Sequence, residues 1–264
     1  MRDDAAGLPR VHVESVGAGA PIVLLHGFAM HGGLFAPLLP ALSRTHRVHV
    51  VDLPGHGRSA AVHAPDLSSM ARAVDAAIDG DAPLTIVGWS LGGQVALQWS
   101  LLRESRIRRL VLVATTPSFV QRSDWPHAVG ENTLARFGDE LAFSYRLTLQ
   151  RFLSLQVQGS DEGRATLAQL RARLFERGEP PASALADALA LLRAADLRPM
   201  LQRIGAPTLV VAGERDALVP LAATTALAAA LPEATHQTIR GAAHAPFLSH
   251  RAAFFDAVLP FVDG

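Results

Sequence analysis

The sequence predicts an α/β protein with a mostly parallel β-sheet and helices on both of its faces. Two patterns indicate this fold class. Short apolar segments alternate with stretches of helical spacing, and several of the apolar segments contain no polar residue, as in residues 21–25. A strand that is buried on both faces has such a continuous apolar run, and parallel sheets covered by helices are built from these strands.

Seven segments are predicted to be strands. The first alternates apolar and polar side chains, which is typical of an edge strand with one solvated face. Most of the others are mainly apolar and end close to a glycine or proline that begins a turn. The predicted strands are residues 11–16, 21–25, 47–52, 84–87, 107–114, 208–212 and 236–239.

Four stretches between or after these strands have helical spacing. Asp66 begins one of them, and its carboxylate can accept an N–H of the first turn as an N-cap. The predicted core helices are residues 34–42, 66–78, 91–102 and 246–258.

Residues 117–198 interrupt this alternation. They contain no pattern of a buried strand, only helical stretches at 133–155, 163–177 and 182–195. We therefore expect an all-helical cap over the site, inserted into a core formed by residues 1–116 and 199–264.

The composition excludes several classes of protein. The 24 basic and 24 acidic side chains cancel, 49% of the residues are hydrophobic, and there is no cysteine. Disorder requires low hydrophobicity and high net charge, nucleic-acid binding usually shows a basic excess, and disulfide frameworks or thiol nucleophiles need cysteine. We therefore expect no nucleic-acid partner. All 24 basic residues are arginine, so no lysine can form a Schiff base.

No targeting segment or membrane span is visible in the sequence. The first ten residues are polar, and the longest apolar runs are far too short to cross a bilayer. These features favour a soluble, cytoplasmic protein without a membrane partner.

The motif Gly-Trp-Ser-Leu-Gly at residues 88–92 lies between a predicted strand and a predicted helix. A sharp strand-to-helix turn leaves no room for side chains beside the serine, which explains the two glycines. The turn raises the Ser90 hydroxyl above the sheet, at the positive end of the following helix. We therefore predict that Ser90 is a catalytic nucleophile.

A serine nucleophile needs a histidine base that is oriented by a carboxylate, and here both should follow the serine in the order acid, then histidine. Asp216 follows the predicted strand 208–212, and His244 follows the strand that ends near Ile239. We predict Asp216 as the acid and His244 as the base. Glu214 and Asp196 remain alternative acids.

Acyl transfer also needs donors for the tetrahedral oxyanion. We predict that these are the backbone N–H groups of Leu91, directly after the nucleophile, and of Phe28, in the loop after residues 21–25. His26 is expected to hold that loop rather than to act in catalysis.

Two further patterns have structural explanations. Residues 55–60 match Gly-x-Gly-x-x-Ala, but no helix opens directly after them, so a structural turn is favoured over a dinucleotide loop. His46 and His49 have no third ligand and lie on or near a strand. We expect neither a cofactor nor a metal.

Taken together, these residues resemble the α/β-hydrolase superfamily. The resemblance rests on His26-Gly27-Phe28, on Asp-Leu-Pro-Gly-His-Gly-Arg-Ser at 52–59, and on Ser90, Asp216 and His244, and it covers essentially the whole chain. A serine at residue 90 excludes the dehalogenases and epoxide hydrolases of this superfamily, which usually place aspartate there.

Within the superfamily, the chain is most similar to the biotin-pathway esterases that demethylate pimeloyl-[acyl-carrier protein] methyl ester. Each matching tract is weak alone, but together they are fairly specific. These tracts are residues 88–93, 116–119, 124–126, 151–156 and 244–250.

The resemblance implies a set of substrate-contacting residues. That family commonly has tryptophan where this chain has Phe28, which changes the wall of the site but leaves the backbone donor in place. The implied contacts are Phe28, Trp89, Leu91, Phe152, Leu153, Ser154, Leu155, Gln156 and His244. An apolar channel for the acyl chain is a related expectation, with Trp89, Phe119, Trp125, Phe143, Phe152 and Leu155 as candidate walls.

The resemblance further implies that arginines of the cap bind the acidic acyl-carrier protein. Arg151 and Arg164 stand at matching positions. Two other expected arginines are Leu147 and Ala168 here, with Arg146 and Arg171 close enough to replace them. Residues 144–177 hold six arginines against three carboxylates, a net charge of +3. A solvated helix face is the alternative interpretation of this charge, which could otherwise steer an acidic partner.

The predicted activity is therefore hydrolysis of a carboxylic ester through an acyl-enzyme on Ser90, by a protein expected to be a monomer. The resemblance implies that the substrate is the methyl ester of pimeloyl-[acyl-carrier protein], in biotin biosynthesis. Other functions remain open: a broad-specificity short-chain carboxylesterase or lactonase, a C–C bond hydrolase or cofactor-free peroxidase, and a non-catalytic ligand receptor on the same scaffold.

Overall fold

The computed structural model describes residues 9–264. A seven-stranded sheet runs through the molecule in the order β1-β3-β2-β4-β5-β6-β7. Only β1 is antiparallel, pairing with β3 at one edge, and every other neighbouring pair is parallel. The fold class predicted from the sequence is thus confirmed. The strands are β1 Val13–Val16, β2 Ala20–Leu25, β3 His46–Val51, β4 Leu84–Trp89, β5 Ile107–Val113, β6 Thr208–Gly213 and β7 Ala234–Ile239.

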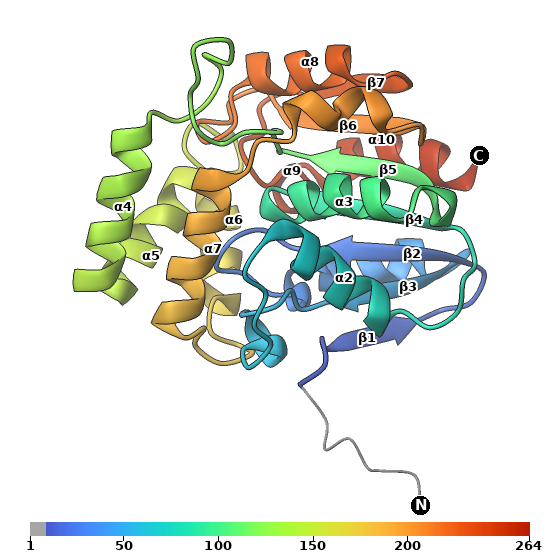
Figure 1. Cartoon of the computed structure of the whole chain (residues 1–264), viewed down its shortest axis with the longest axis horizontal. Helices are drawn as coiled ribbons and strands as arrows, with labels where there is room; N and C mark the ends of the chain where they lie inside the picture. The colour runs from blue at the N-terminus through green and yellow to red at the C-terminus, as the bar shows by residue number, and fades with distance from the viewer. Residues whose placement is uncertain (1–8) are drawn as a thin grey trace, which may run out of the picture.

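Helices cover both faces of the sheet. Figure 1 shows α2 (Leu67–Ala77) and α3 (Leu91–Leu102) on one face and α10 (Arg251–Asp263) on the other. The carboxylate of Asp66 accepts the N–H of Ser69 at 2.6 Å, so this residue caps α2 as predicted. The remaining core helices are the short α1 (Leu39–Leu42), α8 (Leu221–Ala230) and α9 (Pro246–Ser249).

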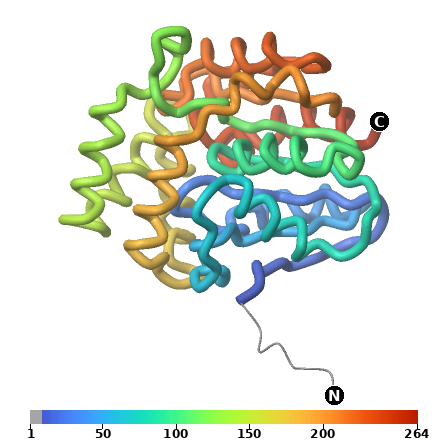
Figure 2. The backbone as a smooth tube through the Cα atoms, in the orientation of Figure 1, coloured from blue at the N-terminus to red at the C-terminus, as the bar shows by residue number. Residues whose placement is uncertain are grey.

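A group of four helices follows β5 and lies together beyond one end of the sheet, which the tube in Figure 2 shows as one continuous stretch from green to amber. They are α4 Glu131–Phe143, α5 Tyr145–Gln156, α6 Gly163–Arg173 and α7 Ala182–Ala194. Before them, residues 117–130 form a loop with the isolated bridges Val120–Val129 and Arg122–Trp125.

Four predicted helices differ from those in the structure. The predicted helix 163–177 ends four residues early, because α6 stops at Arg173. Residues 34–42 are mostly a 3₁₀ helix, η1 (Gly32–Leu38), because it contains Pro37. The predicted helix 133–155 is broken at Ser144, whose φ of −139° and ψ of 58° are not helical. The predicted C-terminal helix is broken at His250 in the same way. At Ser144 the break turns α5 back beside α4, so that both helices face the same pocket. Periodicity alone does not reveal such turns.

The sequence predicts no targeting segment because residues 1–10 are polar. Residues 1–8 lie outside the part of the chain that the structure describes, so this prediction falls largely outside it. Among residues 9–264, none of the helices combines the length and the apolar composition that a bilayer span requires.

Candidate active site

Ser90 occupies the tight turn between β4 and α3 in a strained backbone conformation. Its φ of 55° and ψ of −115° lie in a region that non-glycine residues avoid, and such strain costs about 1–3 kcal/mol. The Ser90 N–H donates to the carbonyl of Val113 at 2.9 Å, and Thr115 Oγ1 donates to the Ser90 carbonyl at 2.7 Å. These bonds from β5 and the segment after it hold the turn in place.

The two glycines of the motif are required by close backbone contacts. A Cβ atom on Gly88 would lie 2.4 Å from the carbonyl oxygen of Gly92, and one on Gly92 would lie 2.3 Å from the carbonyl oxygen of Leu25. The start of α3 therefore packs directly against the ends of β4 and β2. This packing puts Ser90 beside the loop that follows β2.

Asp216 and His244 lie together as the sequence predicts. His244 Nδ1 donates to Asp216 Oδ2 at 2.8 Å, and both side chains are 1% exposed. The other carboxylate oxygen of Asp216 accepts the N–H groups of Leu218 and Val219 at 2.8 and 2.9 Å. Because Nδ1 carries the proton in this pair, Nε2 of His244 is free to accept one. The arrangement is that of an oriented general base.

Neither alternative acid contacts His244. Glu214 accepts the N–H of Gly241, and Asp196 forms an ion pair with Arg198 at 2.7 Å. The hydrogen-bond pattern thus favours Asp216 as the partner of the histidine.

The two predicted oxyanion donors lie where the loop after β2 meets the start of α3. A Cβ atom on Gly27 would be 3.2 Å from Cβ of Ser90, so the backbone preceding Phe28 touches the serine. Within residues 9–264, neither the Phe28 nor the Leu91 amide has a hydrogen-bond acceptor. Buried amides are nearly always paired, so two free ones beside a serine suit an incoming oxyanion.

His26 holds this loop and stays neutral. Its Nδ1 donates to the Gly27 carbonyl at 2.8 Å, while its Nε2 accepts the N–H of Leu53 at 2.9 Å. Burial, aided by the nearby His56, lowers the pKa of His26 to about 3. A neutral imidazole with both nitrogens bonded to the backbone has a structural role.

Ser90 and His244 line one pocket of about 630 Å³ with strongly apolar walls. Its side chains come from the segments after β2, β4, β5, β6 and β7 and from helices α4, α5 and α7, so residues from both halves of the chain meet there. The other lining residues are Phe28, Phe119, Val129, Thr133, Leu134, Phe137, Phe152, Leu155, Leu189, Leu192 and Leu218. We call this cavity the Ser90 pocket.

Some of the residues expected to contact substrate line the Ser90 pocket and others do not. Phe28, Phe119, Phe152 and Leu155 line it. His244 lines it as well. The remaining expected contacts are not among its lining residues: Leu153, Trp89, Gln156 and Leu91 are buried, Ser154 donates to the Gln150 carbonyl of its own helix, Trp125 packs beside Arg198, and Phe143 is 93% exposed.

Gln156 and Trp89 instead contact the main chain of His244. The carbonyl of Gln156, the last residue of α5, accepts the His244 N–H at 3.0 Å. The Trp89 indole N–H donates to the His244 carbonyl at 2.7 Å. Both residues therefore hold the histidine loop rather than forming the pocket wall.

Sequence reasoning missed half of the pocket wall. Seven lining residues were not singled out: Val129, Thr133, Leu134, Phe137, Leu189, Leu192 and Leu218. The apolar faces of α4 and α7 were the available signal, but an apolar helix face can equally pack against a neighbouring helix.

The four arginines expected to bind a carrier protein, Arg146, Arg151, Arg164 and Arg171, are all exposed. Arg146 pairs with Glu179, and Arg151 lies 3.7 Å from Glu140. Two other arginines of the basic stretch 144–177, Arg173 and Arg177, are instead used within the molecule.

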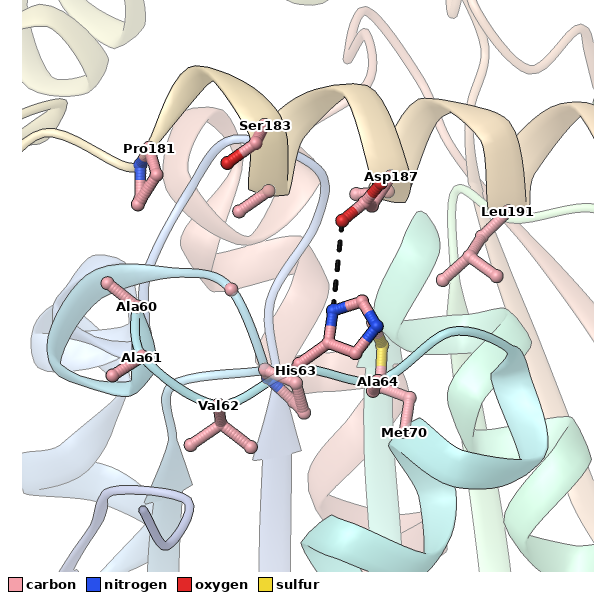
Figure 3. Close-up of a pocket in the computed structure, with 14 residues that line it drawn as sticks. Ala60, Ala61, Val62, His63, Ala64, Met70, Pro181, Ser183, Asp187 and Leu191 are labelled. Carbon is pink, nitrogen blue, oxygen red and sulfur yellow. Dashed lines mark ion pairs between the residues drawn. The ribbon is translucent and has the colours of Figure 1, made fainter. Parts of the chain in front are cut away.

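A second pocket lies between α7 and the loop after β3, away from Ser90. Figure 3 shows His63 facing Asp187 of α7, with 3.8 Å between Nδ1 and the carboxylate. Both side chains are largely exposed, so this contact contributes little to stability. No group of three or more potential metal ligands occurs among residues 9–264, and His49 bonds to Ser15.

Comparison with known proteins agrees with this architecture. A family model described as the alpha/beta hydrolase fold matches residues 20–251. A pimeloyl-[acyl-carrier protein] methyl ester esterase from Xanthomonas campestris pv. campestris (strain B100) is 46% identical over 253 residues, covering 96% of this chain and 98% of the relative. An esterase of the same name from Stenotrophomonas maltophilia (strain K279a) is 44% identical and covers 96% of each chain.

Among solved structures, a bromoperoxidase from Bacillus anthracis superposes with a TM-score of 0.86 at 22% identity, over 96% of this chain and 95% of that one. At this identity the likeness concerns the fold alone. Since the family model spans most of the sequence and the relatives match nearly all of it, the chain belongs to the α/β-hydrolase family.

Proposed function

We propose that this protein is a serine carboxylesterase that hydrolyses the methyl ester of pimeloyl-[acyl-carrier protein]. The observation that carries the proposal is the Ser90 pocket, in which a serine and a carboxylate-oriented histidine are nearly the only polar groups in an apolar cavity. Relatives at 44–46% identity with that name supply the substrate. An apolar cavity suits the methylene chain of a pimeloyl group.

In the proposed reaction, Ser90 Oγ attacks the ester carbonyl carbon while His244 Nε2 accepts its proton. The amides of Phe28 and Leu91 stabilise the oxyanion. The bond to the methoxy group then breaks, and methanol leaves with the proton from His244. Water attacks the acyl-enzyme and gives a proton to His244, which returns it to Ser90 as the free acid departs. Asp216 stabilises the imidazolium in both steps.

Residues 117–198 act as a cap in this proposal. Helices α4, α5 and α7 supply most of the apolar lining, while the core supplies Ser90 and His244. A cap of this kind keeps water away from the acyl chain and positions the ester over the serine.

The carrier protein would dock on the exposed arginines of this cap. Arg164 and Arg171 stand seven residues apart on α6 and so share a face. Arg151 lies one helical turn from Leu155, which lines the Ser90 pocket and is 41% exposed. A bound carrier would thus sit beside the pocket that its acyl chain enters, and its acidic surface would complement the arginines.

The test compares hydrolysis of pimeloyl methyl ester on acyl-carrier protein with hydrolysis of the same ester free in solution. We expect the carrier-bound ester to be preferred, and Arg151→Ala with Arg164→Ala to remove that preference while leaving the rate on the free ester unchanged. Arg72→Ala with Arg251→Ala, on α2 and α10, is the control with the same change in charge.

Equal rates on both esters, with no effect of the cap arginines, would replace this proposal with a broad-specificity short-chain carboxylesterase. The presence of Leu147 and Ala168 where arginine was expected is the observation that keeps this second candidate.

A further inference from the structure

The end of α6 and the turn that follows it bind the loop that carries the Phe28 amide, which we call the Phe28 loop. Arg173 donates through Nη1 to the carbonyl of Gly33 at 3.0 Å, and its own carbonyl accepts His31 Nε2 at 2.6 Å. His31 Nδ1 in turn accepts the Gly33 N–H. Residues 173–177, which we call the anchor segment, therefore contact the core where the Phe28 loop joins η1.

Arg177 extends this contact into the core through a buried ion pair. Its Nη1 lies 3.0 Å from Asp52 Oδ1, and Nη2 bonds to Glu14 on β1. The Arg177 side chain is 9% exposed and that of Asp52 is fully buried. A Cβ atom on Gly33 would lie 3.2 Å from Arg177 Nε, so the guanidinium packs directly against the loop.

Asp52 transmits the contact to the loop backbone. The oxygen that meets Arg177 also accepts the Gly32 N–H at 2.7 Å, while the second oxygen accepts the Arg58 N–H at 2.8 Å. Burial alone would raise the pKa of Asp52, but the His26 imidazole first, then the amide donors of Arg58 and Gly32, and finally the Arg177 guanidinium lower it overall. Without Arg177, the buried Asp52 carboxylate would lose its ion-pair partner, and the oxygen that holds the Gly32 N–H would no longer be fixed from the cap side.

The Phe28 loop is thus fixed at two points that flank the proposed oxyanion donor. His26 bonds to the N–H of Leu53 on one side, and Gly32 bonds to Asp52 on the other. Both partners follow β3 directly in the sequence. Between these points, Ala29 adopts a φ of 61°, a conformation that alanine keeps only when its surroundings hold it.

We propose that Arg177 is a positioning residue for ester hydrolysis: through Asp52 it holds the loop that presents the Phe28 amide, and so joins the cap to the oxyanion site. The inference rests on the proposed acyl transfer at Ser90. It differs from a simple stabilising role because a shift of the amide weakens oxyanion stabilisation in the transition state, whereas substrate binding in the apolar pocket is retained.

The test is steady-state hydrolysis of p-nitrophenyl butyrate by Arg177→Met, measured with the melting temperature of each variant. We expect kcat to fall about tenfold or more with KM changed less than about twofold, since small misplacements of catalytic groups have large effects on rate. Arg177→Lys, which keeps the charge, should recover a substantial part of kcat.

Arg106→Met is the matched control. Arg106 forms another buried ion pair, with Asp75 at 2.5 Å, near the opposite end of β4 from Ser90. This variant should lower the melting temperature and leave kcat within about twofold of wild type, measured well below melting. If Arg177→Met behaves like Arg106→Met, the positioning role is wrong.

If Arg177→Met does not fold, Arg173→Met tests the same junction between the anchor segment and the loop, because Arg173 is 30% exposed and its loss removes the Gly33 carbonyl bond and a surface ion pair with Glu176. An unchanged kcat in that variant would then overturn the inference. If the wild type shows no preference for the carrier-bound ester, the proposed substrate is contradicted and the positioning role of Arg177 is unaffected. If the wild type hydrolyses no ester, both the proposed function and the positioning role are overturned.

Discussion

The indole of Trp89 and the backbone of His244 are joined by a hydrogen bond of 2.7 Å across 155 residues of sequence. Trp89 directly precedes the candidate nucleophile, and its ring lies against the His244 imidazole with 5.6 Å between centroids. The residue before the serine therefore fixes the loop of the candidate base. A side chain interpreted from sequence as a substrate contact is part of the frame that sets the distance between serine and histidine.

Replacing Trp89 with phenylalanine should lower kcat more than it raises KM. The variant keeps an aromatic ring but leaves the buried His244 carbonyl without its donor, at a cost of about 1–3 kcal/mol. Steady-state kinetics and urea unfolding measure the two effects. Trp99→Phe is the control, because its indole bonds to Asp75 away from the pocket, and this variant should lose stability while keeping kcat.

Ser90 is expected to be essential for activity while its strained backbone lowers stability. Ser90→Ala is expected to abolish turnover while the protein stays folded, and retained activity would exclude Ser90 as the nucleophile. Because the φ of 55° strains any side chain, Ser90→Gly should be inactive yet more stable than Ser90→Ala by about 1 kcal/mol in urea unfolding. Equal stability of the two variants would argue against strain at this turn.

Phe137 should limit the length of the acyl chain. Its ring packs edge-on against Phe28 and at a tilt against Phe152, with centroids 6.1 and 5.5 Å away, and lines the Ser90 pocket. Phe137→Ala opens this wall, so the ratio of kcat/KM for a p-nitrophenyl ester of a long acid to that of a short acid should rise. Phe143→Ala, on the same helix but 93% exposed, should leave the ratio unchanged. A similar change in both variants would count against this wall as the limit.

Stability should decrease as the pH falls below about 6.5, partly because His26 is buried and neutral. Burial lowers its pKa to about 3, so between pH 3 and 6.5 the unfolded chain binds a proton that the folded protein does not. The contribution of His26 to stability is fully present above the pKa of the unfolded state, near 6.5, and is lost at about 1.4 kcal/mol for each pH unit below it. Burial lowers the pKa of His31 and His56 in the same sense.

Urea unfolding at pH 5, 6 and 7 measures this slope. His26→Gln should make it shallower by about 1.4 kcal/mol per pH unit, although the protein will be less stable at every pH. His63→Gln, whose side chain is 72% exposed, should leave the slope unaltered. An unaltered slope in both variants would mean that His26 does not couple folding to pH.

Features that depend on a few neighbouring residues follow from the sequence alone. Continuous apolar runs such as residues 21–25 identify buried strands, and the Gly-x-Ser-x-Gly turn at 88–92 needs a strand on one side of it and a helix on the other. Because parallel strands end at one edge of a sheet, loops after separate strands converge there. For this reason the order of residues along the chain predicts a contact between His244 and an acid in the loop after residues 208–212, while the structure shows that Asp216, not Glu214, makes it.

Which side chains of the helices after β5 line the pocket, and which are exposed or bind the core, depends instead on how elements distant in the sequence pack. Phe137 and Phe143 belong to the same helix, yet one lines the pocket and the other is exposed. Arg177 belongs to a stretch that looks like a basic surface, and it is a buried partner of Asp52, 125 residues away. A helical period defines a face but not what packs against it, because that depends on the angles and breaks between elements distant in the sequence.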